Sequence, residues 1–116
     1  MRVLNRTAVS IVGGDPYVAW TRQTDADTDK GLLTVRRAQV YGSAFLLPEF
    51  ELEEDVLEWV EDNAEWIFEV QLAAWTEDRS TWPETRDLAT FRRWFRIDVH
   101  TVVIDAADDD IEGEEL

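Results

Sequence analysis

The strongest hydrophobic pattern along the chain is a helical repeat that runs from residue 51 to residue 75. One face of this repeat has mostly apolar residues three or four positions apart, whereas glutamates recur on the other face at the same spacing. The first face consists of Leu52, Val56, Trp59, Val60, Asn63, Ile67, Val70 and Ala74. Asp62 and Glu65 have the spacing of a capping box, so the pattern predicts either one long helix or two helices that separate near Asn63.

Runs of β-branched and small residues predict three β-strands. The first covers residues 6–12, the second lies within residues 38–48, and the third covers residues 97–105. Strands this short, separated by helical segments, favour an α+β fold over a doubly wound parallel sheet.

Two further helices are predicted from the signals at their ends. A Gly-Gly turn follows the first strand, where Asp15 is expected to be the N-cap and Pro16 suits the first helical position. The last helix begins either at a capping box in Thr81–Glu84 or at Asp87. The predicted order is therefore β-α-β-α-(α)-α-β, a small three-stranded sheet with three to four helices packed on it.

Chain length and the distribution of acids predict one domain followed by a tail. A chain of 116 residues is the usual size of a single domain and can bury one core, which we place in residues 1–104. The stretch "DAADDDIEGEEL" holds seven of the 26 acidic residues of the chain. Because so many charges prevent burial, we expect residues 105–116 to be a disordered acidic tail.

Composition removes several classes of function. The chain has no cysteine, which excludes disulfides, thiolate metal sites and cysteine nucleophiles. No signal peptide and no apolar run long enough to span a bilayer is recognisable, so we expect a cytoplasmic protein without membrane contact. The net charge of −15 opposes binding to nucleic acids or anionic lipids and suits a basic protein partner. Adaptation to high salt is another explanation of the same charge.

Four stretches resemble a family of small acidic bacterial proteins that has no assigned function. They are "NRTAVSIV…PYVAW", "AFLLPEF", "EWIFEVQLAAWTEDRSTWPETRDLATFRRWF" and "DVHTVVID". The resemblance covers most of residues 5–105 and is densest in residues 64–105. It implies one compact domain and assigns no activity.

The stretch "TDADTDKG" at residues 24–31 is the most suggestive metal-binding pattern. An EF-hand loop that starts at Asp25 would need glycine at its sixth position and glutamate at its twelfth. The chain has Lys30 and Arg36 there, which favours a solvated turn. The Gly-Gly turn before Asp15 likewise lacks a phosphate-binding motif. We therefore predict no metal and no cofactor.

His100 is the only histidine and a candidate for acid–base catalysis. It alternates with Val99 and Thr101 in the predicted third strand, which is typical of an outward-facing position. A catalytic role would require His100 and at least two acids to converge in a pocket. No catalytic residue is therefore assigned.

The glutamates of the helical repeat form the main candidate interaction surface. Glu54, Glu58, Glu61 and Glu65 are spaced so that like charges repel along one helix face, which invites a cationic partner. That partner is either another protein or a block of arginines later in the same chain. The block consists of Arg79, Arg86, Arg92, Arg93 and Arg96, of which Arg92 and Arg93 are included in the candidate surface.

The chain has six tryptophans, which is unusually many for its length. Four of them fall at inner-face helical positions and are predicted to be core residues: Trp20, Trp59, Trp75 and Trp94. Trp66 lies at the edge of the apolar face, and Trp82 precedes a proline. Whichever of these two is exposed would be a candidate contact hot spot.

The sequence thus favours a non-catalytic, cytoplasmic interaction module that binds a protein partner as a monomer or a homodimer. One alternative is an inhibitor or immunity-type protein that imitates the charge of DNA and blocks a basic partner. A second alternative is a small hydrolase or metal enzyme that uses His100 with carboxylates.

Overall fold

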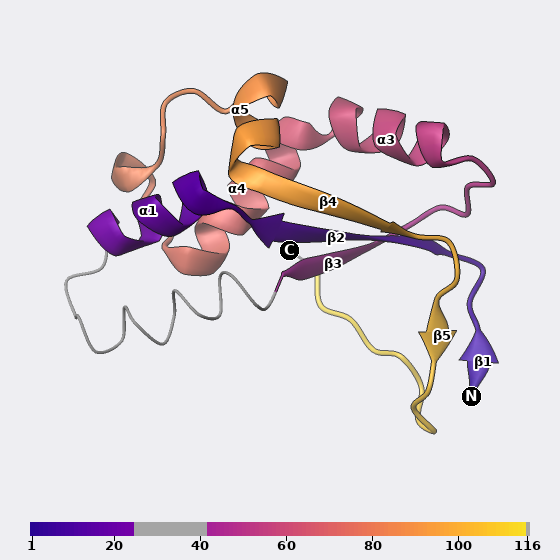
Figure 1. Cartoon of the computed structure of the whole chain (residues 1–116). Coiled ribbons are helices and arrows are strands. Elements are labelled where there is room, and N and C mark those ends of the chain that lie inside the picture. The colour runs from indigo at the N-terminus through magenta and orange to yellow at the C-terminus, as the bar shows by residue number, and fades with distance from the viewer. Residues whose placement is uncertain (25–41, 116) are drawn as a thin grey trace.

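The computed structural model describes residues 1–24 and 42–115. Its main sheet has β2 (Thr7–Gly13) in the centre, between β3 (Ser43–Leu47) and β4 (Phe95–His100), and both pairings are antiparallel. With its helices, this sheet confirms the predicted α+β class (Figure 1). The predicted turn at residues 24–31 lies, apart from its first residue, outside the described residues.

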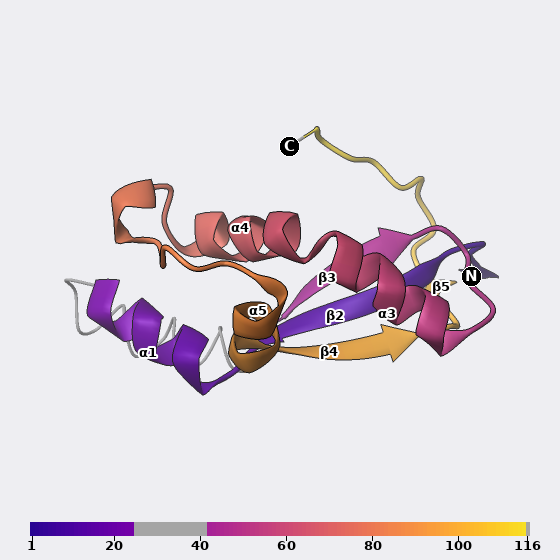
Figure 2. The same cartoon turned by 90° about the horizontal axis from the view of Figure 1, so that it is seen from above.

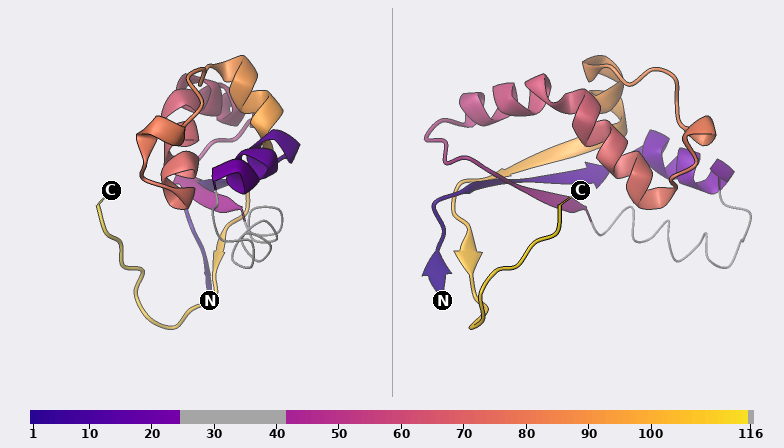
Figure 3. Two further views of the ribbon diagram at one scale, coloured as in Figure 1. Left: turned by 90° about the vertical axis from the view of Figure 1, so that its left-hand side faces the viewer. Right: turned by 180° about the vertical axis from the view of Figure 1, so that it is seen from behind.

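Alternation along β2 determines which face of the sheet is buried. Thr7, Val9 and Ile11 are fully buried on one face, whereas Ser10 and Val12 on the other face are only partly buried. Three helices, α3 (Glu53–Asp62), α4 (Ala64–Trp75) and α5 (Leu88–Trp94), lie over the same face of the sheet (Figures 1 and 3). In the described part of the chain, the opposite face carries no such helical layer.

The first helix, α1 (Asp15–Thr24), follows β2 after a single glycine. The Gly14 carbonyl accepts the first helical hydrogen bond from the Val18 N–H (3.0 Å), and the Gly14 N–H donates to the Trp94 carbonyl (2.7 Å). A Cβ at position 14 would lie 3.3 Å from that Trp94 oxygen, so glycine permits the close approach. The helix thus includes Asp15, which we had expected to be its N-cap.

The repeat at residues 51–75 forms two helices, α3 (Glu53–Asp62) and α4 (Ala64–Trp75), which run end to end above the sheet (Figure 2). They separate at Asn63, as one of the two predictions had it. The predicted capping box of Asp62 and Glu65 is wrong, because Asn63 is the N-cap of α4 and makes no side-chain cap hydrogen bond. Instead, the Asn63 side-chain amide donates to the Trp59 carbonyl (2.8 Å) and closes the end of α3.

This break rotates the buried face of α4 away from the predicted one. Val56 and Val60 of α3 are buried as predicted. The buried residues of α4 are Ala64, Ile67, Phe68, Gln71 and Leu72. Ala74 was predicted to be inside and is exposed, because a period counted through α3 no longer applies beyond Asn63. Leu52 is also exposed, since it is the N-cap of α3 and precedes the first turn.

The last helix, α5 (Leu88–Trp94), begins at Asp87, the second of its two predicted starts. The Asp87 carboxylate accepts hydrogen bonds from the backbone N–H (2.9 Å) and the hydroxyl (2.7 Å) of Thr90. These bonds stabilise the ionised form and lower the pKa of Asp87. The alternative start in Thr81–Glu84 is wrong, because a 3₁₀ turn, η1 (Arg79–Thr81), ends there.

Aromatic rings connect α4, α5 and β4 in the core. Phe68 of α4 lies 5.3 Å from Trp94 of α5 and 5.2 Å from Phe95 of β4, measured between ring centroids. Phe91 lies 5.3 Å from Phe95, and Tyr17 of α1 lies 5.1 Å from the same ring. Because Phe68 and Phe91 are fully buried, this cluster fixes α4 and α5 on the sheet.

The four tryptophans that were predicted to be core residues all pack in or against the core. Trp20 is buried, and its indole N–H donates to the Thr81 carbonyl (2.8 Å). Trp75 is partly buried and donates to the Thr24 hydroxyl (2.8 Å). These bonds satisfy the polar edges of the indoles and tie α1 to α4 and η1.

The predicted strand at residues 97–105 is in fact two strands in two sheets. β4 begins two residues earlier, at Phe95, and ends at His100, whose partner in β2 is Ala8. The chain then forms β5 (Ile104–Asp105), which pairs with β1 (Arg2–Val3). We call this pair the β1–β5 ribbon; it projects away from the main sheet (Figures 1 and 3).

Residues 106–115 contain neither helix nor strand, and every one of them is exposed. The predicted disorder of the tail stays a prediction, and its first residue, Asp105, belongs to β5. Among the described residues, every helix is too short or too polar to cross a lipid bilayer.

Candidate functional site

The four glutamates of the predicted surface all lie on the solvent side of α3 and α4. We call Glu54, Glu58, Glu61 and Glu65 the acidic helix face; all four are exposed. Val56 and Val60 occupy the opposite side of α3 and are fully buried, so the sequence period placed the charges correctly. Glutamates one turn apart repel each other by a few tenths of a kcal/mol per pair (~0.2–0.5).

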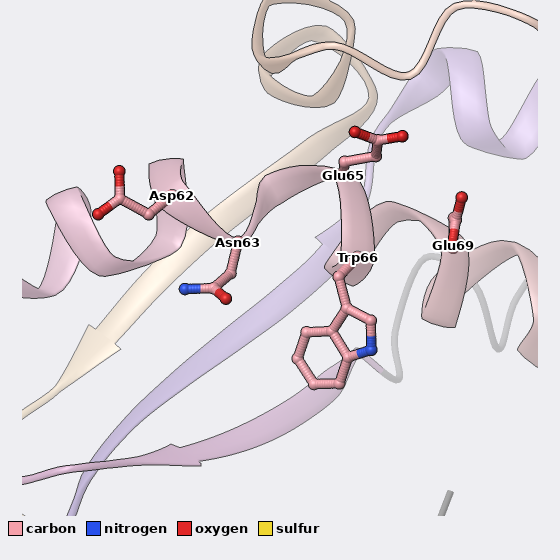
Figure 4. Close-up of a pocket in the computed structure, with 5 residues that line it drawn as sticks. All are labelled: Asp62, Asn63, Glu65, Trp66 and Glu69. Carbon is pink, nitrogen blue, oxygen red and sulfur yellow. The ribbon is translucent and has the colours of Figure 1, made fainter.

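A shallow hollow lies where α3 ends and α4 begins (Figure 4). It has a volume of about 310 Å³ and is lined by Asp62, Asn63, Glu65, Trp66 and Glu69. Three of these five residues are acidic, and one is an aromatic residue at the surface. The hollow thus has three acidic residues and an indole in its lining, although in Figure 4 the Trp66 ring and the carboxylates of Glu65 and Glu69 extend in opposite directions from α4.

Trp66 is the exposed tryptophan that the sequence had singled out. Its side chain is 48% exposed, although an average tryptophan is largely buried. The ring of Phe45 from β3 meets it edge to face, at 6.0 Å between centroids and an interplanar angle of 70°. Phe45 thus holds the indole in place while leaving part of it free for contact, as a hot-spot residue requires.

Trp82, the other candidate, is a core residue. Its exposed fraction is only 9%, and its indole N–H donates to the Thr76 carbonyl (3.0 Å). The Arg79 guanidinium covers the ring at 4.5 Å from its centroid. Trp82 therefore does not meet the condition of exposure and leaves the candidate surface.

The arginine block neutralises part of the acidic surface. Arg92 of α5 forms an ion pair with Glu61. Glu69, one turn beyond the acidic helix face, is 3.7 Å from Arg79 and 3.6 Å from Arg86. The predicted internal neutralisation is thus confirmed for these two glutamates.

Two arginines of the block have other partners. Arg93 donates to the Thr90 hydroxyl (3.3 Å), and Arg96 pairs with Asp98 on the same strand (3.2 Å). Within residues 1–24 and 42–115, no ion pair involves Glu54, Glu58 or Glu65. Among the described residues, three of the four carboxylates of the acidic helix face therefore have no cationic partner.

His100 is exposed on the sheet face that lies opposite the helices, as predicted. Its Nε2 is 2.9 Å from the Ser10 hydroxyl, which is a contact that the sequence pattern did not indicate. The nearest acid along β4 on the same face, Asp98, is hydrogen-bonded to Arg96 instead (3.2 Å). In the described part of the chain, the convergence of His100 with two acids that a catalytic role requires is not observed.

The described residues contain no cluster of three His, Cys, Asp or Glu side chains that could hold a metal ion. One strongly shifted pKa belongs to the core: burial raises the pKa of Tyr17 to about 12. The Tyr17 hydroxyl donates to the Gln71 carbonyl (3.1 Å), so this residue is structural.

Sequence reasoning found the acidic helix face and Trp66 but missed Phe45 and the β1–β5 ribbon. The Phe45–Trp66 contact joins a strand to a helix, and local periodicity contains no signal for it. No family model matches the chain, and the search of curated proteins and of solved structures gave no match either. The predicted family resemblance therefore stays a prediction.

Proposed function

We propose that the protein is a non-catalytic interaction module of the cytoplasm that binds a basic protein partner through α3 and α4. The carboxylates of Glu54, Glu58 and Glu65 supply the attraction, and Trp66 supplies the apolar anchor. The observation that carries this proposal is a tryptophan that is 48% exposed and lines the same hollow as Asp62, Glu65 and Glu69.

Charge and aromatic contact have different effects in such an interface. Exposed carboxylates steer a basic partner toward the surface and raise the association rate, an effect that salt screens. A tryptophan at the centre contributes more to affinity, since removal of a hot-spot residue costs about 2 kcal/mol or more. A lysine or arginine of the partner that stacks on Trp66 would experience both effects.

Affinity capture with matched variants tests the proposal. The helix variant carries Glu54→Gln, Glu58→Gln and Glu65→Gln, whereas the control carries Glu112→Gln, Glu114→Gln and Glu115→Gln and loses the same charge from the tail. Immobilised wild-type protein, helix variant and control are exposed to lysate of the source organism, and mass spectrometry quantifies what each retains. We expect a basic protein that the wild type and the control retain and the helix variant loses.

The contribution of Trp66 is then measured with the purified partner. Trp66→Ala should weaken binding about 30-fold, which corresponds to the loss of a hot spot. Leu46→Ala, at a similarly exposed residue on the other face of the sheet, should leave binding unchanged. Equal retention by the helix variant and the control, or binding that is indifferent to Trp66→Ala, would overturn the proposal. If the partner proves to be a nuclease or toxin whose activity is lost on binding, the result would support the inhibitor alternative.

A further inference from the structure

The acidic helix face is interrupted by a cation from the same chain. Glu61 lies three residues after Glu58 and four residues before Glu65, so it stands between two acids of the face. Its carboxylate forms an ion pair with Arg92 of α5, whereas no ion pair involves Glu58 or Glu65 among the described residues. One carboxylate in the middle of the face is therefore already occupied in the free protein.

The ion pair between Glu61 and Arg92 is open to solvent. The side chain of Arg92 is 59% exposed and that of Glu61 is 41% exposed. Such a pair adds little to stability, so another cation can replace Arg92 at Glu61 without leaving a buried charge unpaired. The fully buried Phe91 holds α5 on the core, whether or not this pair is formed. Exchange of the cation therefore requires only a side-chain movement.

Glu69, the other glutamate with an ion pair in the described part of the chain, is held more firmly. It lies 3.7 Å from Arg79 and 3.6 Å from Arg86, and its side chain is 30% exposed. An incoming cation would have to replace two guanidinium groups, and the Arg86 side chain is only 23% exposed. A largely buried cation that loses its partner is costly, so Glu69 keeps its arginines and Glu61 is the glutamate that can exchange its partner.

We propose that Arg92 is an internal competitor of the basic partner: it occupies Glu61 in the free protein and releases that carboxylate when the partner binds. The inference rests on the proposed function and adds a form of regulation to it. Because only the fraction of molecules with an open ion pair offers Glu61, the internal pair lowers the apparent affinity for every cation. A partner gains from Glu61 only if its own cation pairs with the carboxylate better than Arg92 does.

The test measures the binding of a fluorescent oligoarginine peptide to the full chain by fluorescence anisotropy. Arg92→Gln removes the competitor. Arg93→Gln is the matched control, because it removes the same charge from the next residue, whose side chain is hydrogen-bonded to Thr90 rather than to an acid. Glu61→Gln, alone and combined with Arg92→Gln, completes a double-mutant cycle that isolates the effect of the ion pair.

We expect Arg92→Gln to strengthen peptide binding about two- to fivefold at low salt, because Glu61 no longer has an internal partner, and much less at high salt. Arg93→Gln should strengthen binding less, since it acts only through the long-range effect of one lost positive charge. In the Glu61→Gln protein, the further change Arg92→Gln should have only that smaller effect, because no carboxylate is left to release.

Two results would overturn the competition alone. One is equal strengthening by Arg92→Gln and Arg93→Gln, since net charge would then account for the whole effect. The other is an Arg92→Gln effect that persists undiminished in the Glu61→Gln protein.

Failure of the proposed function gives a different pattern. The helix variant would then bind the peptide as well as the tail control does, whatever the arginine variants show, and the inference would fall with the function. If instead the helix variant loses binding and Arg92→Gln gains none over Arg93→Gln, the proposed function stands and the competition is rejected.

Discussion

Helices α3 and α4 come from one continuous pattern in the sequence, yet different interactions hold them in the structure. In α4, Phe68 packs between Trp94 and Phe95, and the buried face reaches from Ala64 to Leu72. In α3, two valines alone are fully buried, and an ion pair between Glu61 and Arg92 links the helix to α5. α4 is therefore mainly a core helix, whereas α3 mainly exposes charged side chains to solvent.

This difference follows from composition on either side of Asn63. The ten residues of α3 include six acids, so only a narrow stripe can be buried. The twelve residues of α4 include two acids and carry aromatic or aliphatic residues on several sides. The candidate binding surface lies on the outer side of both helices, but α4 supplies most of the buried residues beneath it.

Truncation of one core residue on each helix should give the largest difference in the free energy of unfolding. Phe68→Ala should lower the free energy of unfolding by about 3–5 kcal/mol, because it removes a ring from the aromatic cluster and leaves a cavity. Val56→Ala, at an equally buried position of α3, should cost about half as much or less, since it removes only two methyl groups. Urea denaturation of both variants measures the ratio. An equal loss would mean that α3 contributes to the core as much as α4.

High pH should loosen the attachment of α4 to α1. Burial raises the pKa of Tyr17 to about 12, whereas in the unfolded chain a tyrosine ionises near pH 10. The stabilisation from the neutral phenol is therefore present below pH ~10 and is lost as the pH rises toward 12, by up to about 2–3 kcal/mol.

Tyr17→Phe isolates this effect from other groups that titrate at high pH. The variant should be less stable at neutral pH by about 1 kcal/mol, because the hydrogen bond to the Gln71 carbonyl is absent. Its stability should then fall less than that of the wild type between pH ~8 and ~12, as followed by denaturation at each pH. Parallel curves for the two proteins would show that the phenol is not protected in the folded state.

Loss of the Arg92 charge on α5 should lower the stability of the protein only slightly, and only at low salt. Arg92→Gln removes the ion pair with Glu61 and should lower the free energy of unfolding by about 0–1 kcal/mol, since both side chains are largely exposed. Arg93→Gln serves as the matched control, because Arg93 is hydrogen-bonded to Thr90 rather than to an acid of α3. Thermal denaturation at low and high salt compares the two. The same melting temperature for both variants at low salt would show that the ion pair adds nothing.

The two helices also show which parts of this fold periodicity can predict. The spacing of Val56 and Val60 against the glutamates placed α3 correctly, because its fully buried residues repeat along one face. Beyond Asn63 the same count placed Ala74 inside, although it is exposed. The interruption at Asn63 rotates the buried face of the following helix. The period of the sequence contains no sign of that rotation.

Contacts that no repeat in the sequence encodes account for the remaining errors. The Trp82 indole contacts the Thr76 carbonyl and the Arg79 guanidinium across the η1 turn, an irregular segment without a period. β1 and β5 have two residues each, too few for a recognisable alternation. The acidic helix face could be predicted because exposure follows from composition, whereas the hollow beside Trp66 depends on Phe45 from another element.

The position of β2 between β3 and β4 has a consequence for the order of events during synthesis and folding. Ser10 and His100, which meet across the sheet, are 90 positions apart, so the central strand receives its second neighbour only after a long intervening stretch has been made. Until then, one edge of β2 has no strand to pair with. Closing so long a loop slows the pairing of β2 with β4. We therefore expect that edge of β2 to be the part of the nascent chain most prone to pairing with foreign strands until β4 has been made.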